Sequence, residues 1–198
     1  MRRALRWSGV GALLSAMACS GDGSSDGSGG GTQRRYALGK PATAERVAAV
    51  DLDVGPDGTG LPAGRGTVAQ GATIWAAKCA SCHGAKGEGM PPAYPPLVGR
   101  DSAMENFAFA KDWKAPRTIG NYWPYATTLF DYVRRAMPHT TPGSLSNDEV
   151  YALTAWLLSS NGVLAQDATL DAASLVAVKM PSATRFVPDN RRGGRELK

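Results

Sequence analysis

Two cysteines and a histidine lie close together near the middle of the chain, in the order Cys79, Ala80, Ser81, Cys82 and His83. Two thiols three positions apart, followed directly by an imidazole, are the pattern of c-type haem attachment. In that chemistry the cysteine sulfurs add across the two vinyl groups of the porphyrin, and the histidine gives a ring nitrogen to the iron. The pattern therefore predicts one covalent haem c, with His83 as an iron ligand.

A Cys-x-x-Cys pair has two other uses, as a disulfide or redox pair and as half of a zinc site. A zinc site needs two more ligands, and only Cys19 and His139 are left in the chain. A redox pair does not need the histidine that follows it. We therefore favour haem attachment over both alternatives.

Length and composition favour one main domain with extensions, since the chain has 198 residues and 43% hydrophobic residues. The formal net charge of +5 includes three arginines at the N-terminus, Arg2, Arg3 and Arg6. Without these three of the 22 basic residues, 19 basic side chains stand against 17 acidic ones, which leaves +2. The basic residues are scattered, so we expect no nucleic-acid partner.

Residues 1–18 have a basic start, a short apolar run and small residues at the end, which is the pattern of a secretory signal. The segment that follows, 19–35, is rich in Gly, Ser and Asp and is expected to be a flexible tether. Residues 14–19 also resemble a bacterial lipoprotein box. We therefore expect a periplasmic protein, and we favour lipidation of Cys19, which would anchor it to a membrane without a span.

The first long helix is expected to run from Thr67, a suitable N-cap, to Cys79. Gly71, Trp75 and Cys79 share one face of it, and the glycine allows another helix to approach closely. A second helix is expected to begin after Ser146, with Glu149 completing a capping box, and to end at the stop signal of residues 161–162. Its apolar stripe consists of Val150, Leu153, Trp156 and Leu157.

The pairs Gly71/Trp75 and Leu153/Trp156 resemble the crossing helices of class I cytochromes c, in which a glycine and an aromatic, then a leucine and an aromatic, recur at these offsets. The resemblance implies an all-α fold that encloses the haem between an N-terminal and a C-terminal helix. On this basis we divide the chain into five parts: the signal, the tether, an irregular lead-in (36–64), the cytochrome c domain (65–162) and an extended C-terminal tail (163–198).

The same resemblance implies a second contact for the histidine. In class I cytochromes a proline carbonyl twelve residues after the histidine accepts its other ring N–H, ahead of a leucine that packs on the haem. Pro95 and Leu97 stand at these offsets from His83, and Pro96 is the alternative proline. We therefore assign Pro95 and Leu97 to the haem site.

The sixth iron ligand is expected from a methionine that precedes a proline, and the class I pattern places it before the last helix. Met137 satisfies that pattern, whereas Met90 follows His83 too closely and Met180 lies beyond the last helix. His139 is the rival, and two histidines would give a lower reduction potential than a histidine and a sulfur. We therefore expect His83 and Met137 as the iron ligands.

An aromatic-rich segment precedes Met137, and Pro124 within it suits the first turn of a helix that would lead to this methionine. Tyr122 and Trp123 are candidates to donate hydrogen bonds to a haem propionate. Arg134 or Arg135 are candidates to offset its charge. Simple packing is the alternative for each of these side chains.

Residues 51–188 resemble the cytochrome subunit of bacterial sulfite and sulfane-sulfur dehydrogenases. The resemblance rests on residues 56–62 and 118–138, on Pro142, Gly143, Ser144 and Leu145, and on parts of 179–188. Some cytochromes of sulfane dehydrogenases carry two haems, whereas this chain has one attachment motif.

That resemblance implies an electron-transfer protein, not an enzyme. Its donor would be a molybdopterin-containing dehydrogenase subunit and its acceptor a downstream cytochrome or oxidase. The alternatives are a general periplasmic shuttle, a redox or gas sensor, or a haem enzyme or gas-binding protein if Met137 does not bind the iron.

Overall fold

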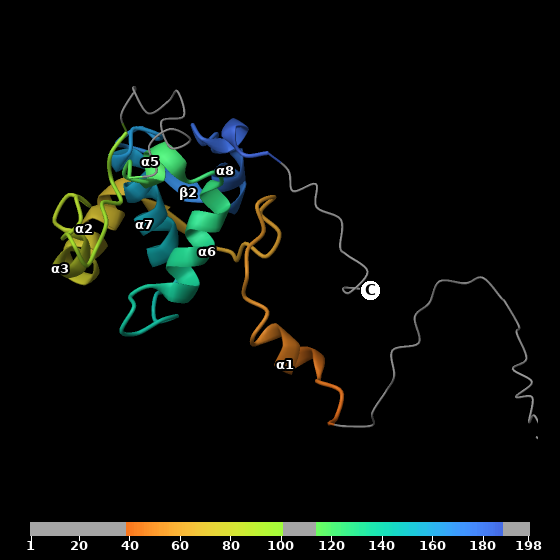
Figure 1. Ribbon diagram of the computed structural model, residues 1–198. Coiled ribbons are helices and arrows are strands. Elements are labelled where there is room, and N and C mark those ends of the chain that lie inside the picture. The colour runs from red at the N-terminus through yellow and green to blue at the C-terminus, as the bar shows by residue number, and fades with distance from the viewer. Residues whose placement is uncertain (1–38, 101–113, 188–198) are drawn as a thin grey trace, which may run out of the picture. The chain divides into compact units, whose positions relative to one another are not determined.

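The computed structural model describes residues 39–100 and 114–187. The chain divides into two units, Met1–Pro41 and Ala42–Lys198, and every element described below belongs to the second. The described elements are, in chain order, α1 (Ala44–Ala48), β1 (Arg65–Thr67), α2 (Val68–Lys78), α3 (Ala80–His83), α5 (Ile119–Tyr122), α6 (Ala126–Ala136), α7 (Asn147–Ser160), β2 (Thr169–Asp171), α8 (Ala172–Ala177) and the 3-10 helix η2 (Ala183–Arg185) (Figure 1). Helices supply most of the core, which confirms the predicted all-α class.

The two long helices begin where their capping residues predict. The Thr67 side chain accepts from the N–H of Gln70, and the Gln70 side chain accepts in return from Thr67, so α2 starts with a capping box. Ser146 and Glu149 form the same reciprocal pair at the start of α7. Asn161 is the C-cap of α7, so this helix also ends as predicted.

The predicted pairing of the two helices is confirmed, since α2 packs along α7 (Figure 1). A Cβ at Gly71 would collide with the carbonyl group of Ala152 and would lie 2.7 Å from the Cβ of Trp156. The glycine therefore lets the two backbones touch. One turn later, the rings of Trp75 and Trp156 stack with their centroids 4.3 Å apart.

A third helix completes the core. The Phe130 ring of α6 lies 4.5 Å from the Tyr151 ring of α7, measured between centroids, and both side chains are fully buried. Pro124 precedes the N-cap of α6, Tyr125, so it lies just outside the helix and not in its first turn. The short helix α5 lies before it and was not predicted.

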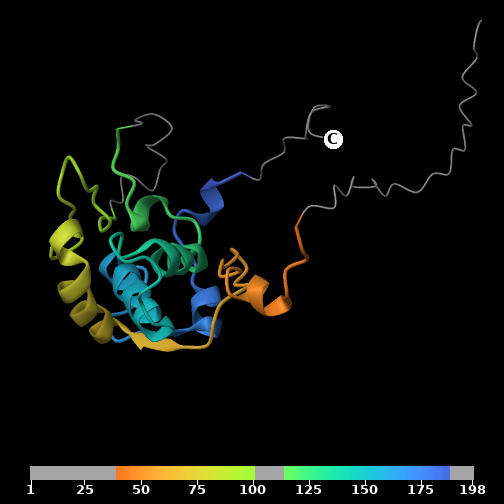
Figure 2. The same ribbon diagram turned by 90° about the horizontal axis from the view of Figure 1, so that it is seen from below.

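The described part of the C-terminal tail packs on the domain. Strand β2 pairs antiparallel with β1, with Leu170 opposite Gly66, and this short strand pair was not predicted. Leu170 in β2 and Leu175 in α8 are buried in the core. From β1 the chain enters α2 directly and follows one side of α7 (Figure 2).

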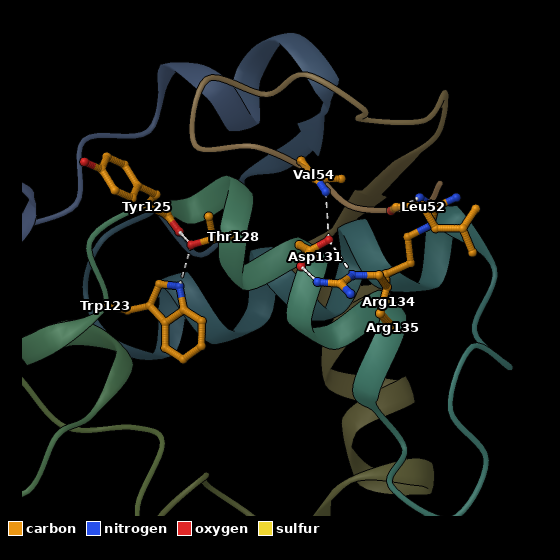
Figure 3. Close-up of polar contacts among 8 residues, drawn as sticks. All are labelled: Leu52, Val54, Trp123, Tyr125, Thr128, Asp131, Arg134 and Arg135. Carbon is orange, nitrogen blue, oxygen red and sulfur yellow. Dashed lines mark hydrogen bonds and ion pairs between the residues drawn. The ribbon is translucent and has the colours of Figure 1, made fainter. Parts of the chain in front are cut away.

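Hydrogen bonds attach the lead-in to α6 and α7, so this segment is less independent than its irregular sequence suggests. The Val54 N–H donates to Asp131 over 2.8 Å, and Arg134 donates to the carbonyl of Leu52 over 3.0 Å (Figure 3). Further along, the Tyr151 hydroxyl donates to the carbonyl of Pro62 over 2.8 Å. These contacts join parts of the chain that are 77 to 89 residues apart.

Asp131 is the main polar anchor of the lead-in. Its carboxylate is buried and also accepts two hydrogen bonds from Arg135, four residues later on α6 (Figure 3). Burial by itself raises the pKa of Asp131, but the bonds from Arg135 and from the N–H of Val54 outweigh it and lower that pKa below its ordinary value. The carboxylate is therefore charged at neutral pH and stabilises the folded state.

Within the described residues, each helix is too short or too polar to cross a bilayer.

Replacing Gly71 with alanine should destabilise the protein by about 1–2 kcal/mol, because the new methyl group would force α2 and α7 apart. Intrinsic helix propensity alone would favour alanine by about 1 kcal/mol, so a net loss would isolate the steric effect. Urea unfolding followed by circular dichroism measures this change. Ala72→Ser, at an exposed position of α2, is the matched control and should be nearly neutral. A Gly71→Ala protein as stable as the wild type would contradict the close contact.

Replacing Asp131 with asparagine should lower the free energy of unfolding at pH 7 by about 1–2 kcal/mol, because the variant loses the charged partner of Arg135. A lowered folded-state pKa stabilises the protein above the ordinary carboxyl pKa, and this stabilisation is lost as the pH falls through the folded value. The difference between wild type and variant should therefore hold above about pH 5 and shrink below about pH 4. Asp51→Asn, at an exposed carboxylate, is the control. A difference independent of pH would refute the role of the charge.

Candidate haem site

The cysteines and the histidine lie on one helical turn, directly after α2. Cys79 is both the C-cap of α2 and the residue before α3, and its carbonyl accepts from the N–H groups of Cys82 and His83 over 3.1 and 3.0 Å. Residues three apart on a helix are neighbours on one face, so both thiols can reach one flat ligand. Neither cysteine forms a disulfide.

The three side chains are partly buried, and burial changes the ionisation of Cys79 and His83. Burial is the main reason why the pKa of the Cys79 thiol is raised to about 11, so this thiol is protonated at neutral pH. Burial also lowers the pKa of His83, which favours the neutral imidazole. A neutral imidazole keeps a lone pair that can bind a metal.

His83 also carries a buried polar atom that is available for a partner. Its Nδ1 is fully buried and makes no hydrogen bond with any described residue. A buried ring nitrogen of this kind costs free energy unless it finds a ligand or an acceptor. Two thiols on one turn and an imidazole with an unpaired nitrogen fit covalent haem attachment.

Two aromatic rings flank the imidazole. The ring of Trp75 lies 5.9 Å from that of His83, and its indole N–H donates to the carbonyl of Gly84 over 3.1 Å. The ring of Tyr94 meets His83 edge-on at 5.7 Å. The neighbouring Cys82 thiol is the largest cause that raises the pKa of the Tyr94 phenol.

The buried Nδ1 of His83 has no hydrogen-bond partner among the described residues, and its bond to the carbonyl of Pro95 stays a prediction. The backbone around Pro95 packs on Gly89, where a Cβ would lie 2.6 to 2.7 Å from atoms of Tyr94, Pro95 and Pro96. The side chain that meets the imidazole is that of Tyr94, one residue before the expected proline. Counting residues from His83 could not show that the side chain of Tyr94, next to Pro95, lies against the imidazole.

Leu97 is half-buried and packs against the core. Its backbone N–H donates to Gly87, and its carbonyl accepts from Ile119 and from the side chain of Asn161. Leu97 is therefore fixed in the loop that follows the haem motif, and its contact with a haem stays a prediction.

Asn161, which the sequence predicted only as the end of a helix, also holds the loop that follows the haem motif. Its buried amide oxygen accepts from the N–H groups of Gly99 and Gly120, and its amide nitrogen donates to the carbonyls of Leu97 and Leu157. An asparagine side chain has two N–H donors and one oxygen that can accept two hydrogen bonds, so the hydrogen-bonding capacity of Asn161 is fully used. Nothing in a single sequence separates such a residue from an ordinary helix cap.

Met137 is the C-cap of α6 and is half-buried. The end of α6 and the loop that follows it lie toward the same end of the domain as α3 (Figure 1). Its rivals are placed differently: Met90 and His139 are exposed, whereas Met180 is buried in the main core. Iron ligation by Met137 stays a prediction.

The aromatic and basic residues near Met137 have other partners in this structure. The indole N–H of Trp123 donates to Thr128 over 3.0 Å, so a bond from it to a propionate would have to replace this one (Figure 3). Tyr122 is partly exposed and meets the ring of Phe186 edge-on at 5.4 Å. Haem contacts of Tyr122 and Trp123 stay predictions.

The two arginines contact other parts of the chain, and their role near a haem propionate stays a prediction. Arg135 pairs with Asp131, and Arg134 donates to Leu52, so both hold the lead-in. Asp131 and Arg135 are four residues apart on α6, which places opposite charges on the same face of the helix.

Cys19, the signal and the whole tether lie outside the described residues.

Comparison with protein families matches residues 68–161 to the family described as Cytochrome c. Among solved structures, the chain is similar to a chain in the crystal structure of the sulfane dehydrogenase SoxCD from Paracoccus pantotrophus, with 42% sequence identity and a TM-score of 0.70. This match covers 79% of the present chain and 74% of the other. A search of curated proteins gave no match. The family match runs from the start of α2 to the C-cap of α7 and includes the whole Cys79–His83 turn.

Proposed function

Because this chain belongs to the cytochrome c family and is an electron-transfer protein with covalent haem c, we propose that it takes single electrons from a molybdenum-containing sulfite or sulfane-sulfur dehydrogenase. In this proposal the protein works in the periplasm and passes the electrons to a respiratory acceptor, a downstream cytochrome or an oxidase. It is not the catalytic partner. The observation that carries the choice of donor is the 42% identity with a chain of a sulfane dehydrogenase.

Four side chains would hold the haem. Cys79 and Cys82 would form the thioethers, and the neighbouring His83 would bind the iron from one side. Met137, half-buried at the end of α6, would be the second iron ligand. The bound haem supplies an iron that gains or loses one electron.

The protein's own contribution is a fixed surrounding for that iron. Trp75 is held by a hydrogen bond and by its stack on Trp156, and Asn161 holds the loop that contains Leu97. Such constraints limit rearrangement when the charge of the site changes. Two ligands from the chain would also leave no open position for a substrate, which favours electron transfer over catalysis or gas binding.

The location rests on the N-terminal sequence. Residues 1–18 carry the pattern of an export signal, and Cys19 followed by a Gly- and Ser-rich segment fits a lipid anchor with a tether. An anchor of this kind would keep the domain near a membrane-bound acceptor.

Replacing Met137 with alanine should lower the reduction potential and open the iron to added cyanide or carbon monoxide, because the sulfur ligand would be lost. Optical spectra and a redox titration of the purified protein measure both effects. Met90→Ala, at an exposed methionine that also precedes a proline, is the control and should behave as wild type. An unchanged spectrum in Met137→Ala would refute its role, and His139→Ala would then be tested as the rival.

The donor is tested by mixing the oxidised protein with the reduced molybdenum subunit of a sulfane dehydrogenase and following haem reduction by stopped-flow absorbance. We expect reduction that saturates with donor concentration and is faster than that of an unrelated cytochrome c of similar potential. A sulfite dehydrogenase subunit, tested in parallel, separates the two sulfur substrates. Equal rates with all donors would favour a general shuttle and contradict a dedicated partner.

A further inference from the structure

Two segments that are far apart in the sequence meet beside α5. The buried Ser182 hydroxyl donates to the carbonyl of Trp123 over 2.7 Å, although 59 positions separate the two residues. Phe186 meets the ring of Tyr122 edge-on, with 5.4 Å between the ring centroids. The end of the described tail is therefore fixed against the segment that contains α5.

Aromatic rings are exposed where these two segments meet. Tyr122 and Phe186 are 38% and 40% exposed, and Phe186 lies outside the hydrophobic core. The Arg117 guanidinium lies over the Tyr122 ring, 5.4 Å from its centroid, which is within the range of a cation–π contact. Tyrosine, phenylalanine and arginine are enriched in protein–protein interfaces.

The charge of the two segments has one sign. Residues 114–125 and 178–187 contain four basic side chains and neither aspartate nor glutamate, whereas the whole chain has 22 basic and 17 acidic residues. The four are Lys114, Arg117, Lys179 and Arg185. All are exposed except Arg185, which is half-buried. These cations and the rings of Tyr122 and Phe186 form a surface that we call the aromatic-basic patch.

Half of the patch lies outside the cytochrome c domain. The family match ends at residue 161, before the tail, whereas the match to the sulfane dehydrogenase chain covers 79% of the present chain. The likeness to that chain therefore extends beyond the family domain. Phe186 contributes neither to that domain nor to the core, so contact with another molecule is the better account of its place at the surface.

We propose that the aromatic-basic patch is the surface on which the molybdenum-containing electron donor docks, through a complementary surface rich in carboxylates. The inference rests on the proposed function, in which a dehydrogenase of this kind is the donor. The cations steer the encounter, since exposed charges act over about 10 Å at moderate salt. The rings supply the contact that holds the complex together. A small surface suits the weak encounters of redox partners.

An anionic membrane is another surface that cations and aromatic rings can meet. A helix that lies in a membrane surface needs one continuous apolar face. The two helices at the patch are too short for this, since α5 has 4 residues and η2 has 3. Ile119 of α5 is moreover buried in the core. These features favour a protein partner.

Charge reversal tests the steering role. The double variant Arg117→Glu/Lys179→Glu acts inside the patch, and Lys40→Glu/Arg46→Glu makes the same change in net charge at exposed positions in and before α1. The haem-loaded full chain is mixed with the reduced molybdenum subunit of a sulfane dehydrogenase, and haem reduction is followed by stopped-flow absorbance at several salt concentrations. Thermal unfolding and the reduction potential of each variant show whether fold and haem site are intact.

The patch variant should lower the second-order rate constant about tenfold at low salt and remove most of its salt dependence, because steered association falls steeply with ionic strength. The control variant should stay within about twofold of the wild type. A patch variant that reacts as fast as the control would overturn the inference. If charge reversal prevents folding, Arg117→Gln/Lys179→Gln gives the same comparison with a smaller loss.

The ring is tested by calorimetric titration with the oxidised molybdenum subunit. Phe186→Ala should raise the Kd about tenfold at every salt concentration, because an interface ring acts mainly on dissociation. Val50→Ala, at an apolar residue that is 78% exposed, is the control and should bind as the wild type does. An unchanged Kd in Phe186→Ala would contradict the role of the ring.

The same measurements separate this inference from the proposed function. If the wild type is reduced no faster than an unrelated cytochrome c, the proposed donor is wrong and the docking surface fails with it. If the wild type is reduced rapidly and the patch variants match their controls, only the docking surface fails. Vesicles of phosphatidylglycerol and of phosphatidylcholine test the membrane. A preference for the anionic vesicles that the patch variant loses, with unchanged reduction by the donor, would overturn the protein partner.

Discussion

At Gly71 the backbone of α2 lies directly on the carbonyl group of Ala152 in α7, with no side chain between them. This contact sets the distance between the two long helices, and it brings Trp75 onto Trp156 one turn further along. Because α3 follows α2 after a single residue, the same contact also fixes where the cysteines and the histidine are presented. The haem motif is thus positioned by a backbone contact that lies outside it.

The loops around the site are held by buried polar side chains. Asn161 joins the loop at Leu97 and Gly99 to α5 and to the end of α7. Asp131 joins the lead-in to α6 in the same way. A buried amide or carboxylate is unfavourable unless its partners are in place, so each of these residues tolerates few alternative loop arrangements. Such a framework suits a protein whose task is to change the charge of an enclosed iron with little movement.

Much of the fold followed from local patterns. The capping boxes at Thr67 and Ser146 marked the starts of both long helices, and the glycine at position 71 indicated the helix contact. The strand pair was missed because strands of three residues are too short to show a periodic pattern. The long-range contacts of Arg134 with Leu52 and of Asp131 with Val54 were not predicted, because residues 77 to 82 positions apart leave no local pattern.

The sequence by itself determined the chemistry of the haem turn and the two helices that flank it, because these depend on residues within a few positions of one another. Only the tertiary structure decided which side chains surround His83 and which hold the loops. The bond between Val54 and Asp131 spans 77 residues, and that between Gly99 and Asn161 spans 62. Contacts over such distances leave no local periodicity in the chain. They exist because the packing of α2, α6 and α7 brings their partners together.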